Sequence, residues 1–269
     1  MNTETSQGIL AWFRTFTAGY AEDGGPLHPL LQLKLDHSRR VAGDSLAIAI
    51  ELGWDEDAQR TAEIAGLLHD AGRFPQFARY RTFFDPSSLN HGECGYHTVT
   101  ASGALGACAA ADAAAILDSI RYHNRRQIPG AVAEASLRFL RLVRDADKLD
   151  ILFVVNDTIL NNRHKEHPEI LLNITLEGPP TPELVREIME TRSGSYENIK
   201  TLADMSLMRL SWIHDVNYVP TLRRIADRRL LDDACAALPK TPDIETIIAN
   251  TKRHMEGKLS PAGSSRSET

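Results

Sequence analysis

The sequence contains little cysteine: only Cys94, Cys108 and Cys235 occur among its 269 residues, and they are widely scattered. An odd and scattered set excludes a disulfide framework and a cysteine-rich zinc site, and it predicts a reduced, cytoplasmic protein. The first residues lack the charged segment and apolar core of a signal peptide. No run of about 20 apolar residues occurs, so we expect no membrane-spanning segment and no membrane partner.

An excess of positive charge is absent as well. The chain has 30 Lys and Arg residues against 36 Asp and Glu residues, which gives a net charge of −6 with neutral histidines. General nucleic-acid binding needs basic clusters that neutralise phosphates, so we do not expect it. The phosphate-binding loop and the dinucleotide-binding fingerprint are also missing. With 42% hydrophobic residues, the chain can form one large globular domain or one domain with an appendage.

Apolar residues recur at helical spacing along most of the chain, without convincing strand alternation, and this predicts an all-α fold. Thr181 followed by Pro182 is typical of a helix N-cap and first helical position. We expect irregular structure at 73–90, an extended segment at 169–176 and disorder at 260–269. Helices are expected at about 5–20, 29–52, 56–69, 91–106, 109–123, 131–156, 182–191, 196–215, 220–237 and 243–257.

The stretch Leu67-Leu68-His69-Asp70-Ala71-Gly72-Arg73 ends an apolar helix with a histidine and an aspartate side by side. Packing gives little reason for this pair, because aspartate is rarely buried unless it is paired or bound to a metal. Gly72 and Pro75 end the helix, so both side chains can reach one ion. Taken alone, the pair is also compatible with an ordinary structural role.

Other residues of the metal-ligating type lie on the apolar faces of further predicted helices. His37, His69, His123 and Asp147 each follow apolar residues at spacings of three, four or seven, which places them on inward faces. His91 begins a helix directly after the arginine-rich segment. A single inward histidine is most often a satisfied core residue. Several on successive helices would converge in one core, where a metal would offset the cost of burying carboxylates.

The order His37, His69-Asp70, His91, His123, Asp147 resembles the six-ligand form of the HD-domain superfamily of metal-dependent phosphohydrolases. Two sequence segments agree with that family: the one around the His69-Asp70 doublet, and Arg144-Asp145-Ala146-Asp147-Lys148-Leu149-Asp150. The resemblance covers about residues 28–156 and implies an HD-domain helical bundle as the metal-binding core. The remaining parts are then an N-terminal helix and loop at 1–27, a C-terminal helical extension packed on the core at 157–257, and a disordered tail at 258–269.

The resemblance further implies two divalent metal ions with Asp70 as the bridge between them. The implied ligands are His37, His69, Asp70 and Asp147 for the first ion, and Asp70, His91 and His123 for the second. Asp147 also shares a helical face with the apolar residues Val143 and Ile151, which favours it over Asp145 as the ligand. Asp145 shares a face with arginines and is expected to be solvated or ion-paired. Ligands with only nitrogen and oxygen donors suit Mn, Fe, Mg, Ni, Co or Zn without choosing among them.

The activity that the resemblance implies is hydrolysis of a phosphomonoester or phosphodiester, with a nucleotide as one candidate, by metal-activated hydroxide. Asp70 and Arg73 are the expected catalytic residues, and Arg73 would also hold the phosphate. Arg79, Arg81 and Lys148 are further candidates for substrate binding, although the two arginines also fit ordinary solvated loop charge. The expected partner is a small phosphorylated substrate, and a homo-oligomer stays open.

Two other functions remain as alternatives. The same ligand order resembles inositol oxygenase and related diiron enzymes, which carry out oxidative cleavage. A non-catalytic ligand-binding module with a structural metal is the other, and the complete ligand set disfavours it. Gly95-Tyr96 is followed by His97, whereas the cyclic-dinucleotide phosphodiesterases of the superfamily carry a Gly-Tyr-Pro signature. We therefore do not assign that substrate.

Overall fold

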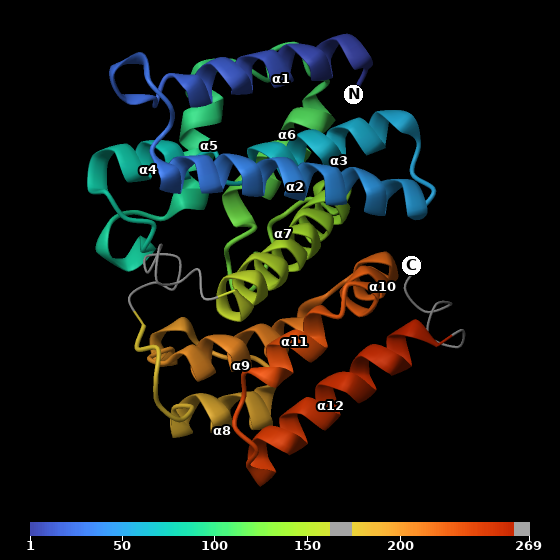
Figure 1. Ribbon diagram of the computed structural model, residues 1–269. Coiled ribbons are helices and arrows are strands. Elements are labelled where there is room, and N and C mark those ends of the chain that lie inside the picture. The colour runs from blue at the N-terminus through green and yellow to red at the C-terminus, as the bar shows by residue number, and fades with distance from the viewer. Residues whose placement is uncertain (162–173, 261–269) are drawn as a thin grey trace. The chain divides into compact units, whose positions relative to one another are not determined.

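The computed structural model of the protein describes residues 1–161 and 174–260, and within these ranges every regular element is a helix (Figure 1). The β-type pairing in this part of the chain is an isolated bridge between Thr175 and Thr201. The predicted all-α fold is therefore confirmed. The chain divides into two compact units, Met1–Asp147 and Lys148–Thr269.

The first unit is a helical bundle built around one apolar core. Its helices are α1 (Thr3–Ala18), α2 (Pro29–Glu51), α3 (Glu56–Leu68), α4 (Arg73–Tyr80), α5 (His91–Ser102), α6 (Ala110–Tyr122) and the first part of α7 (Glu134–Leu160). The core contains fully buried side chains from four of these helices, namely Leu68, Phe74, Ile120 and Val143. Removing this apolar surface from water is the main force that holds the helices together.

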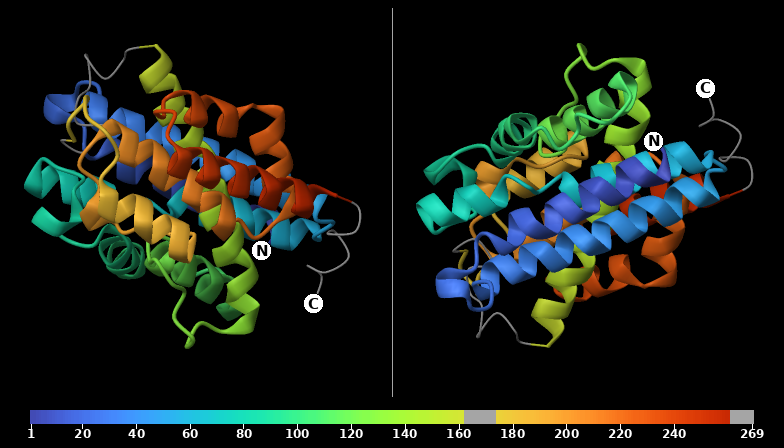
Figure 2. Two further views of the ribbon diagram at one scale, coloured as in Figure 1. Left: turned by 90° about the horizontal axis from the view of Figure 1, so that it is seen from below. Right: turned by 90° about the horizontal axis from the view of Figure 1, so that it is seen from above.

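Helices α2 and α3 form an antiparallel hairpin and lie side by side (Figure 2). Gly53 makes the turn with a φ of 70°, a conformation that glycine adopts at no steric cost. Asp55 then caps α3, because its carboxylate accepts a hydrogen bond from the Ala58 amide at 2.8 Å. The two helices pack closely: a Cβ at Gly66 would lie 2.6 Å from Ser45 Oγ. This close packing sets the end of α3 against the inner face of α2.

The prediction of irregular structure for 73–90 is wrong over its first half, where α4 forms. Pro75 suggested a break, but it lies in the first turn of α4, where a backbone N–H needs no intrahelical acceptor. Phe74 and Phe77 of the same helix are buried in the core, and this packing stabilises it. Arg81 ends α4 in the left-handed conformation with a φ of 54°. Beyond it, regular structure resumes with the short 3-10 helix η2 (Asp85–Ser87).

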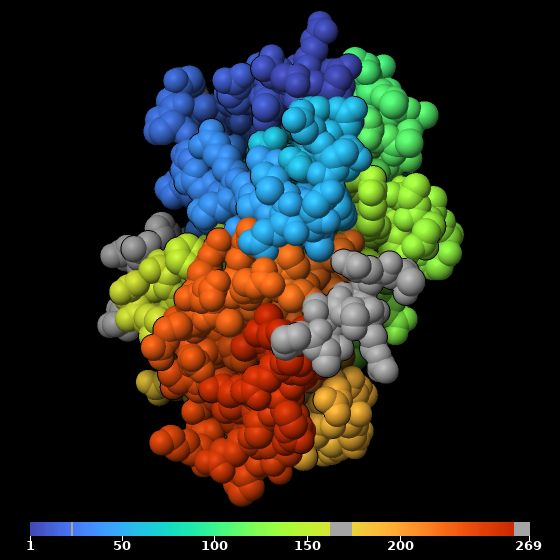
Figure 3. Space-filling model, turned by 90° about the vertical axis from the view of Figure 1, so that its right-hand side faces the viewer, coloured from blue at the N-terminus to red at the C-terminus, as the bar shows by residue number. Residues whose placement is uncertain are grey.

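The second unit has an apolar core of its own. Its elements are the rest of α7, α8 (Pro182–Thr191), η5 (Tyr196–Asn198), α9 (Leu202–Trp212), η6 (Ile213–Asp215), α10 (Val219–Asp227), α11 (Leu230–Ala236) and α12 (Pro242–Leu259). Leu152, Leu184, Leu207 and Ile225 are fully buried in this core. Helix α12, drawn in red in Figure 3, is exposed along one face of the unit.

Two helices predicted for this unit are divided in the structure. The helix expected at 196–215 is regular only in α9, with the 3-10 turns η5 and η6 before and after it. The helix expected at 220–237 breaks into α10 and α11 at Arg229, which has a φ of 55°. The break lets Leu230 and Leu231 enter the core, where each is 3% exposed. Packing therefore overrides the helical propensity of the segment.

Asp204 organises the starts of both α8 and α9. Thr181 occupies the predicted N-cap position of α8, but its hydroxyl donates to Asp204 Oδ2 at 2.7 Å instead of capping its own helix. The Asp204 carboxylate also accepts from the backbone amides of Thr181, Lys200 and Thr201 at 2.6, 3.0 and 2.9 Å. Burial opposes ionisation of Asp204, yet these hydrogen bonds lower its pKa.

Among the described residues, none of the helices combines the length and apolar character that crossing a bilayer requires. Most of the predicted extended segment 169–176 lies outside the described residues, and Thr175 within it forms the bridge to Thr201. Nearly all of the predicted disordered tail 260–269 also lies outside them. The domain boundaries expected after residues 27, 156 and 257 stay predictions.

Candidate metal centre

Six polar side chains meet inside the first unit, and all six are the predicted metal ligands. His37 lies on α2 and Asp147 on α7, while His91 is the first residue of α5. His69 and His123 are the C-cap residues of α3 and α6, and Asp70 directly follows the first of them. Every one of these residues except Asp147 is at most 5% exposed. Residues at helix ends and two residues inside helices, His37 and Asp147, thus come from five helices to one buried place.

Half-site A consists of His37, His69, Asp147 and one carboxylate oxygen of Asp70. The Nε2 atoms of His37 and His69 are 3.1 Å apart. His37 Nε2 lies 3.2 Å from Asp147 Oδ1 and 3.6 Å from Asp70 Oδ2. His69 Nε2 lies 3.6 Å from Asp147 Oδ1 and 3.8 Å from Asp70 Oδ2. Two imidazoles and two carboxylates therefore face one another.

Half-site B consists of His91, His123 and the other carboxylate oxygen of Asp70. The two Nε2 atoms are 3.0 Å apart. Asp70 Oδ1 lies 3.4 Å from His91 Nε2 and 3.7 Å from His123 Nε2. Potential donor atoms of His69, His123 and Asp147 also lie within 4.8 Å of one another, so the half-sites adjoin. Asp70 thus presents one oxygen to each half-site.

Hydrogen bonds at Nδ1 orient three of the four imidazoles. His69 Nδ1 donates to the carbonyl of Gly66 at 2.7 Å, and His123 Nδ1 donates to the carbonyl of Ile120 at 2.9 Å. In each case the acceptor lies three residues earlier, in the last turn of the preceding helix, so both C-cap histidines make the same hydrogen bond. His91 Nδ1 donates to Asp85 Oδ2 at 2.7 Å. With the proton at Nδ1, each neutral ring presents the lone pair of Nε2 to the centre.

The facing lone pairs test whether a cation fits the centre. In half-site B, both rings use Nδ1 as the donor, and the two Nε2 atoms are nevertheless 3.0 Å apart. Two lone pairs at that distance repel each other, whereas a cation shared by both satisfies both. The oxygen of Asp70 beside them is a third donor. These groups are the nitrogen and oxygen ligands that divalent metals accept, so the residues fit a metal site.

The protonation states also suit metal binding. Burial lowers the pKa of His69, and burial together with the Arg73 charge lowers the pKa of His91 to about 3. Burial opposes ionisation of Asp70, but Lys34, His69 and Arg73 lower its pKa well below the ordinary range. The pKa of Asp147 is likewise lowered, because its bonds to His37 and His69 outweigh the cost of burial. Neutral imidazoles and ionised carboxylates are the forms that coordinate metals.

Asp85 supports half-site B and was missed in the sequence. Besides His91 Nδ1, its carboxylate accepts from Arg73 Nη1 at 3.0 Å and from Gln76 Nε2 at 2.9 Å. A carboxylate that accepts from the second nitrogen of a ligand histidine fixes the ring and raises its basicity. The only signal in the sequence was an aspartate six residues before His91, in a segment that was predicted to be irregular.

Lys34 is the second residue that the sequence analysis missed. Its ammonium lies 2.9 Å from Asp70 Oδ2, while Arg73 Nε lies 3.4 Å from Asp70 Oδ1. The two cations also lie over the ring of Phe83, at 5.6 and 5.7 Å from its centroid. Lys34 precedes His37 by three residues on α2, and this spacing places both on one helical face. A basic residue at that spacing is a signal that the sequence did contain.

Arg79, Arg81 and Lys148, the other predicted substrate-binding residues, contact residues outside the group of six. Arg79 is exposed and lies over the ring of Tyr80. Arg81 pairs with Glu22 at 2.7 Å, and its side chain is 60% exposed. Lys148 belongs to the second unit and pairs with Asp215 at 2.6 Å. Asp145 is fully buried, so it is not solvated as one of the two expectations had it, and the other expectation, an ion-paired side chain, stays a prediction.

The turn after the His-Asp doublet touches α5 directly. A Cβ at Gly72 would lie 2.5 Å from the amide nitrogen of Gly95, and it would lie still closer to the carbonyl oxygen of His91. A Cβ at Gly95 would lie 2.8 Å from Ile120 Cγ2. Only glycine permits such an approach. The contact brings the start of α5, and with it His91, to Asp70.

Comparison with known protein families gives a match around this centre. The family model of the HD domain matches residues 35–152, a range that contains all six clustered residues. Comparisons with curated proteins and with solved structures found no match.

Proposed function

Because residues 35–152 form an HD domain, we propose that this chain is a metal-dependent phosphohydrolase that cleaves a phosphomonoester or a phosphodiester. HD domains belong to a superfamily of metal-dependent phosphohydrolases. The observation that carries the proposal is the position of Asp70, whose two oxygens serve two adjoining pairs of histidines. This arrangement supports two metal ions, and the donor atoms leave open which of Mn, Fe, Mg, Ni, Co or Zn is bound.

The proposed ligands follow the two half-sites. His37, His69, Asp147 and Asp70 Oδ2 would hold one ion, and His91, His123 and Asp70 Oδ1 the other. Divalent ions bound there lower the pKa of coordinated water and neutralise charge on a phosphoryl group. Asp70 would contact both ions, and the Nδ1 hydrogen bonds hold three of the imidazoles in the tautomer that can coordinate a metal.

Arg73 is the proposed phosphate-binding residue. Its Nη1 is bound to Gln76, Phe83 and Asp85, which fixes the guanidinium beside Asp70. Its Nη2 makes no hydrogen bond to a described residue and is available to a phosphate oxygen. Lys34 is the second cation at Asp70 and would share this role. Arg79, Arg81 and Lys148 stay predictions as substrate-binding residues.

Metal content tests the centre first. We would measure metal in protein purified without chelator, in the parent and in a His91→Ala/His123→Ala double variant. The expected result is about two equivalents in the parent and about one in the double variant. His97→Ala is the matched control, because His97 is exposed on α5, the helix that also carries His91. No bound metal, and no uptake from Mn, Fe or Zn, would overturn the proposal.

Activity tests the reaction class. The loaded parent and an Asp70→Asn variant would be assayed with p-nitrophenyl phosphate, bis-p-nitrophenyl phosphate and a panel of nucleotides. Hydrolysis that is lost on chelation, restored by metal and abolished in the variant is the expected result. Oxygen consumption by iron-loaded protein without phosphate release would support the oxygenase instead. Metal binding with neither activity would support the non-catalytic module.

A further inference from the structure

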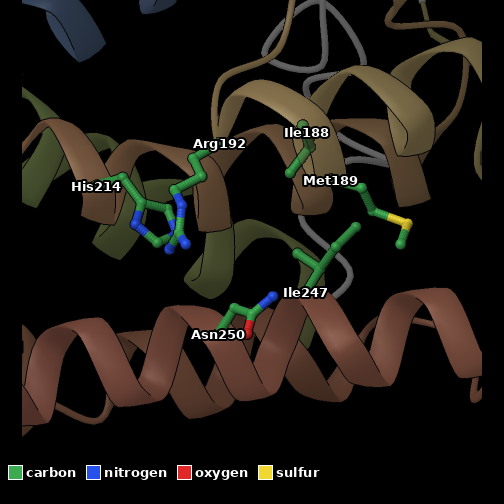
Figure 4. Close-up of a pocket in the computed structure, with 6 residues that line it drawn as sticks. All are labelled: Ile188, Met189, Arg192, His214, Ile247 and Asn250. Atoms are coloured by element: carbon green, nitrogen blue, oxygen red, sulfur yellow. The ribbon is translucent and has the colours of Figure 1, made fainter.

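The second unit contains a small pocket formed by the end of α8, the 3-10 turn η6 and the middle of α12 (Figure 4). Its volume is about 270 Å³ when the open mouth is included. Arg192 and His214 lie on one side of it, and Asn250 projects from α12 below them. All of the residues involved belong to the second unit, so the pocket is separate from the metal centre. The pocket is lined by Ile188, Met189, Arg192, His214, Ile247 and Asn250.

Two of the residues that line this pocket, Arg192 and His214, are basic, and none of the lining residues is acidic. Burial, together with the nearby His254 and Arg192, lowers the pKa of His214 to about 4. Burial, Lys258 and Arg192 lower the pKa of His254 in the same way. No carboxylate of the described residues contributes to the pKa shift of either imidazole. The permanently charged side chains that act on these imidazoles, Arg192 and Lys258, are both cations, and cations attract anions.

Two imidazole nitrogens beside the pocket have unmet hydrogen-bonding capacity. The rings of His214 and His254 pack with their centroids 4.6 Å apart. His214 Nε2 lies 3.3 Å from Thr251 Oγ1, but His214 Nδ1 and His254 Nε2 are buried and have no hydrogen-bond partner among the described residues. Buried polar atoms in native proteins nearly always have a partner. Because His214 lines the pocket, its unpartnered Nδ1 indicates that a ligand belongs here.

Arg192 is held in place at the mouth of the pocket. It is the C-cap residue of α8, with a φ of 60°, and its amide donates to the carbonyl of Ile188 at 2.9 Å. The left-handed conformation is costly for a residue with a side chain. The guanidinium makes no ion pair with a described carboxylate and is exposed. An unpaired guanidinium on a fixed backbone is well suited to bind an oxyanion through two hydrogen bonds.

The rest of the lining is apolar. Ile188 and Met189 of α8 and Ile247 of α12 form this part, and Met189 is 44% exposed. A metal ion is disfavoured here, because the Arg192 charge opposes it and no group of three potential ligands among the described residues includes His214 or His254. An anion that carries a short apolar substituent can instead use both halves of the pocket.

We propose that this pocket binds a small organic oxyanion, with its charged head on Arg192, His214 and Asn250 and its apolar substituent against Ile188, Met189 and Ile247. The head is a phosphate or a carboxylate, since both offer oxygens that a guanidinium and an imidazole recognise. Such a ligand would neutralise the basic cluster and stabilise the contact of α8 with α12. The proposal does not depend on the reaction at the metal centre.

The test is calorimetric titration of the full-length protein with butyl phosphate, butyrate and inorganic phosphate. Arg192→Gln removes the charge, and Arg229→Gln is the matched control, because Arg229 is also exposed and left-handed at a helix terminus. An Asp70→Asn variant is titrated in parallel, so that binding at the metal centre is recognised. NMR signals of the His214 and His254 rings report whether the ligand reaches the pocket.

The expected result is binding of butyrate that weakens about tenfold or more in Arg192→Gln and is unchanged in Arg229→Gln and Asp70→Asn. Butyl phosphate is itself a phosphomonoester that the metal centre would also bind, so its binding to the pocket is read in the Asp70→Asn protein, where it should shift the His214 and His254 signals. The apolar substituent should also improve affinity over inorganic phosphate. Equal binding by the parent and Arg192→Gln would overturn the proposal. Equal losses in both arginine variants would overturn it as well, since they indicate unspecific attraction to charge. Binding that disappears only in Asp70→Asn would assign the ligand to the metal centre.

Discussion

The backbones of Gly72 and Gly95 approach so closely that a Cβ on Gly72 would lie 2.5 Å from the amide nitrogen of Gly95. This contact joins the turn that carries Asp70 to the helix that begins with His91. It therefore sets the distance between the shared carboxylate and half-site B, which is 3.4 Å from Asp70 Oδ1 to His91 Nε2. The geometry of the candidate centre depends on two residues that contribute no ligand.

Gly72→Ala is expected to push α5 away from Asp70. Overpacking of this kind costs about 1–3 kcal/mol of unfolding free energy, and here it should also lower the metal content toward one equivalent. Urea unfolding and metal analysis check the two effects. Gly43→Ala is the control, because a Cβ at Gly43 of α2 meets nothing within 4 Å. That variant should gain about 0.5–1 kcal/mol, as alanine is favoured over glycine inside a helix. Normal stability and full metal content in Gly72→Ala would contradict the role of the contact.

Asp85→Asn should weaken metal binding at half-site B selectively. An amide cannot accept from His91, Arg73 and Gln76 as the carboxylate does, so the His91 ring loses its fixed orientation. Loss of such a supporting group typically lowers metal affinity about 10- to 100-fold. Competition with a chromogenic chelator would measure one weakened and one unchanged equivalent. Asp243→Asn, at an exposed position of α12, serves as the charge control. A parallel loss at both equivalents would argue against a role confined to half-site B.

Asp204→Ala should destabilise the second unit by about 2–4 kcal/mol, because three backbone amides and the Thr181 hydroxyl lose their charged acceptor. Asp204→Asn retains one acceptor oxygen and is expected to fall between this variant and the parent. Denaturant unfolding gives the free energies. Metal content, which reports on the first unit, should be unchanged in both variants. Equal stability of all three proteins would show that the four hydrogen bonds contribute nothing.

The stability of the second unit should fall as the pH drops from about 6.5 to about 4. Burial lowers the pKa of His214 to about 4 in the folded protein, while an unfolded chain has a histidine pKa of about 6.5. Within this window the unfolded chain binds a proton that folded His214 does not, so stability is complete above the window and is lost below it. The basic neighbours His254, Arg192 and Lys258 act in the same direction.

Urea unfolding of the parent and of His214→Gln at several pH values, in phosphate-free buffer, measures this effect. The variant should show a shallower dependence on pH, because it lacks one of the titrating groups. Identical slopes in the two proteins would contradict the assignment to His214.

The helices and the six clustered residues could be predicted because both depend on local patterns. His37 and Asp147 follow apolar residues at helical spacing, and that spacing alone directs them to the inside of the bundle. His69 and His123 end apolar helices, where a C-cap side chain can turn back to its own carbonyls. The helical spacing thus placed four of the six residues on inward faces, whereas the assignment of the full set, including His91, followed from the resemblance to HD domains.

Features that depend on two distant segments could not be predicted in the same way. Helix α4 forms because Phe74 and Phe77 reach a core made by other helices, which local reading of Pro75 does not reveal. The support that Asp85 gives to His91 depends on how the intervening turn folds. The break at Arg229 likewise follows from the packing of the leucines after it. Lys34 is different, since its spacing from His37 was visible in the sequence.

The division of the Asp70 carboxylate between its neighbours has an evolutionary consequence. One oxygen faces half-site A and the other faces half-site B, and the two sites share no histidine. A lineage can therefore lose His91 or His123 by mutation while every ligand of half-site A stays in place. Loss of Asp70 would instead remove one oxygen donor from each half-site at the same time. Selection should accordingly tolerate drift in the second pair of histidines long before it tolerates any change in the His-Asp doublet.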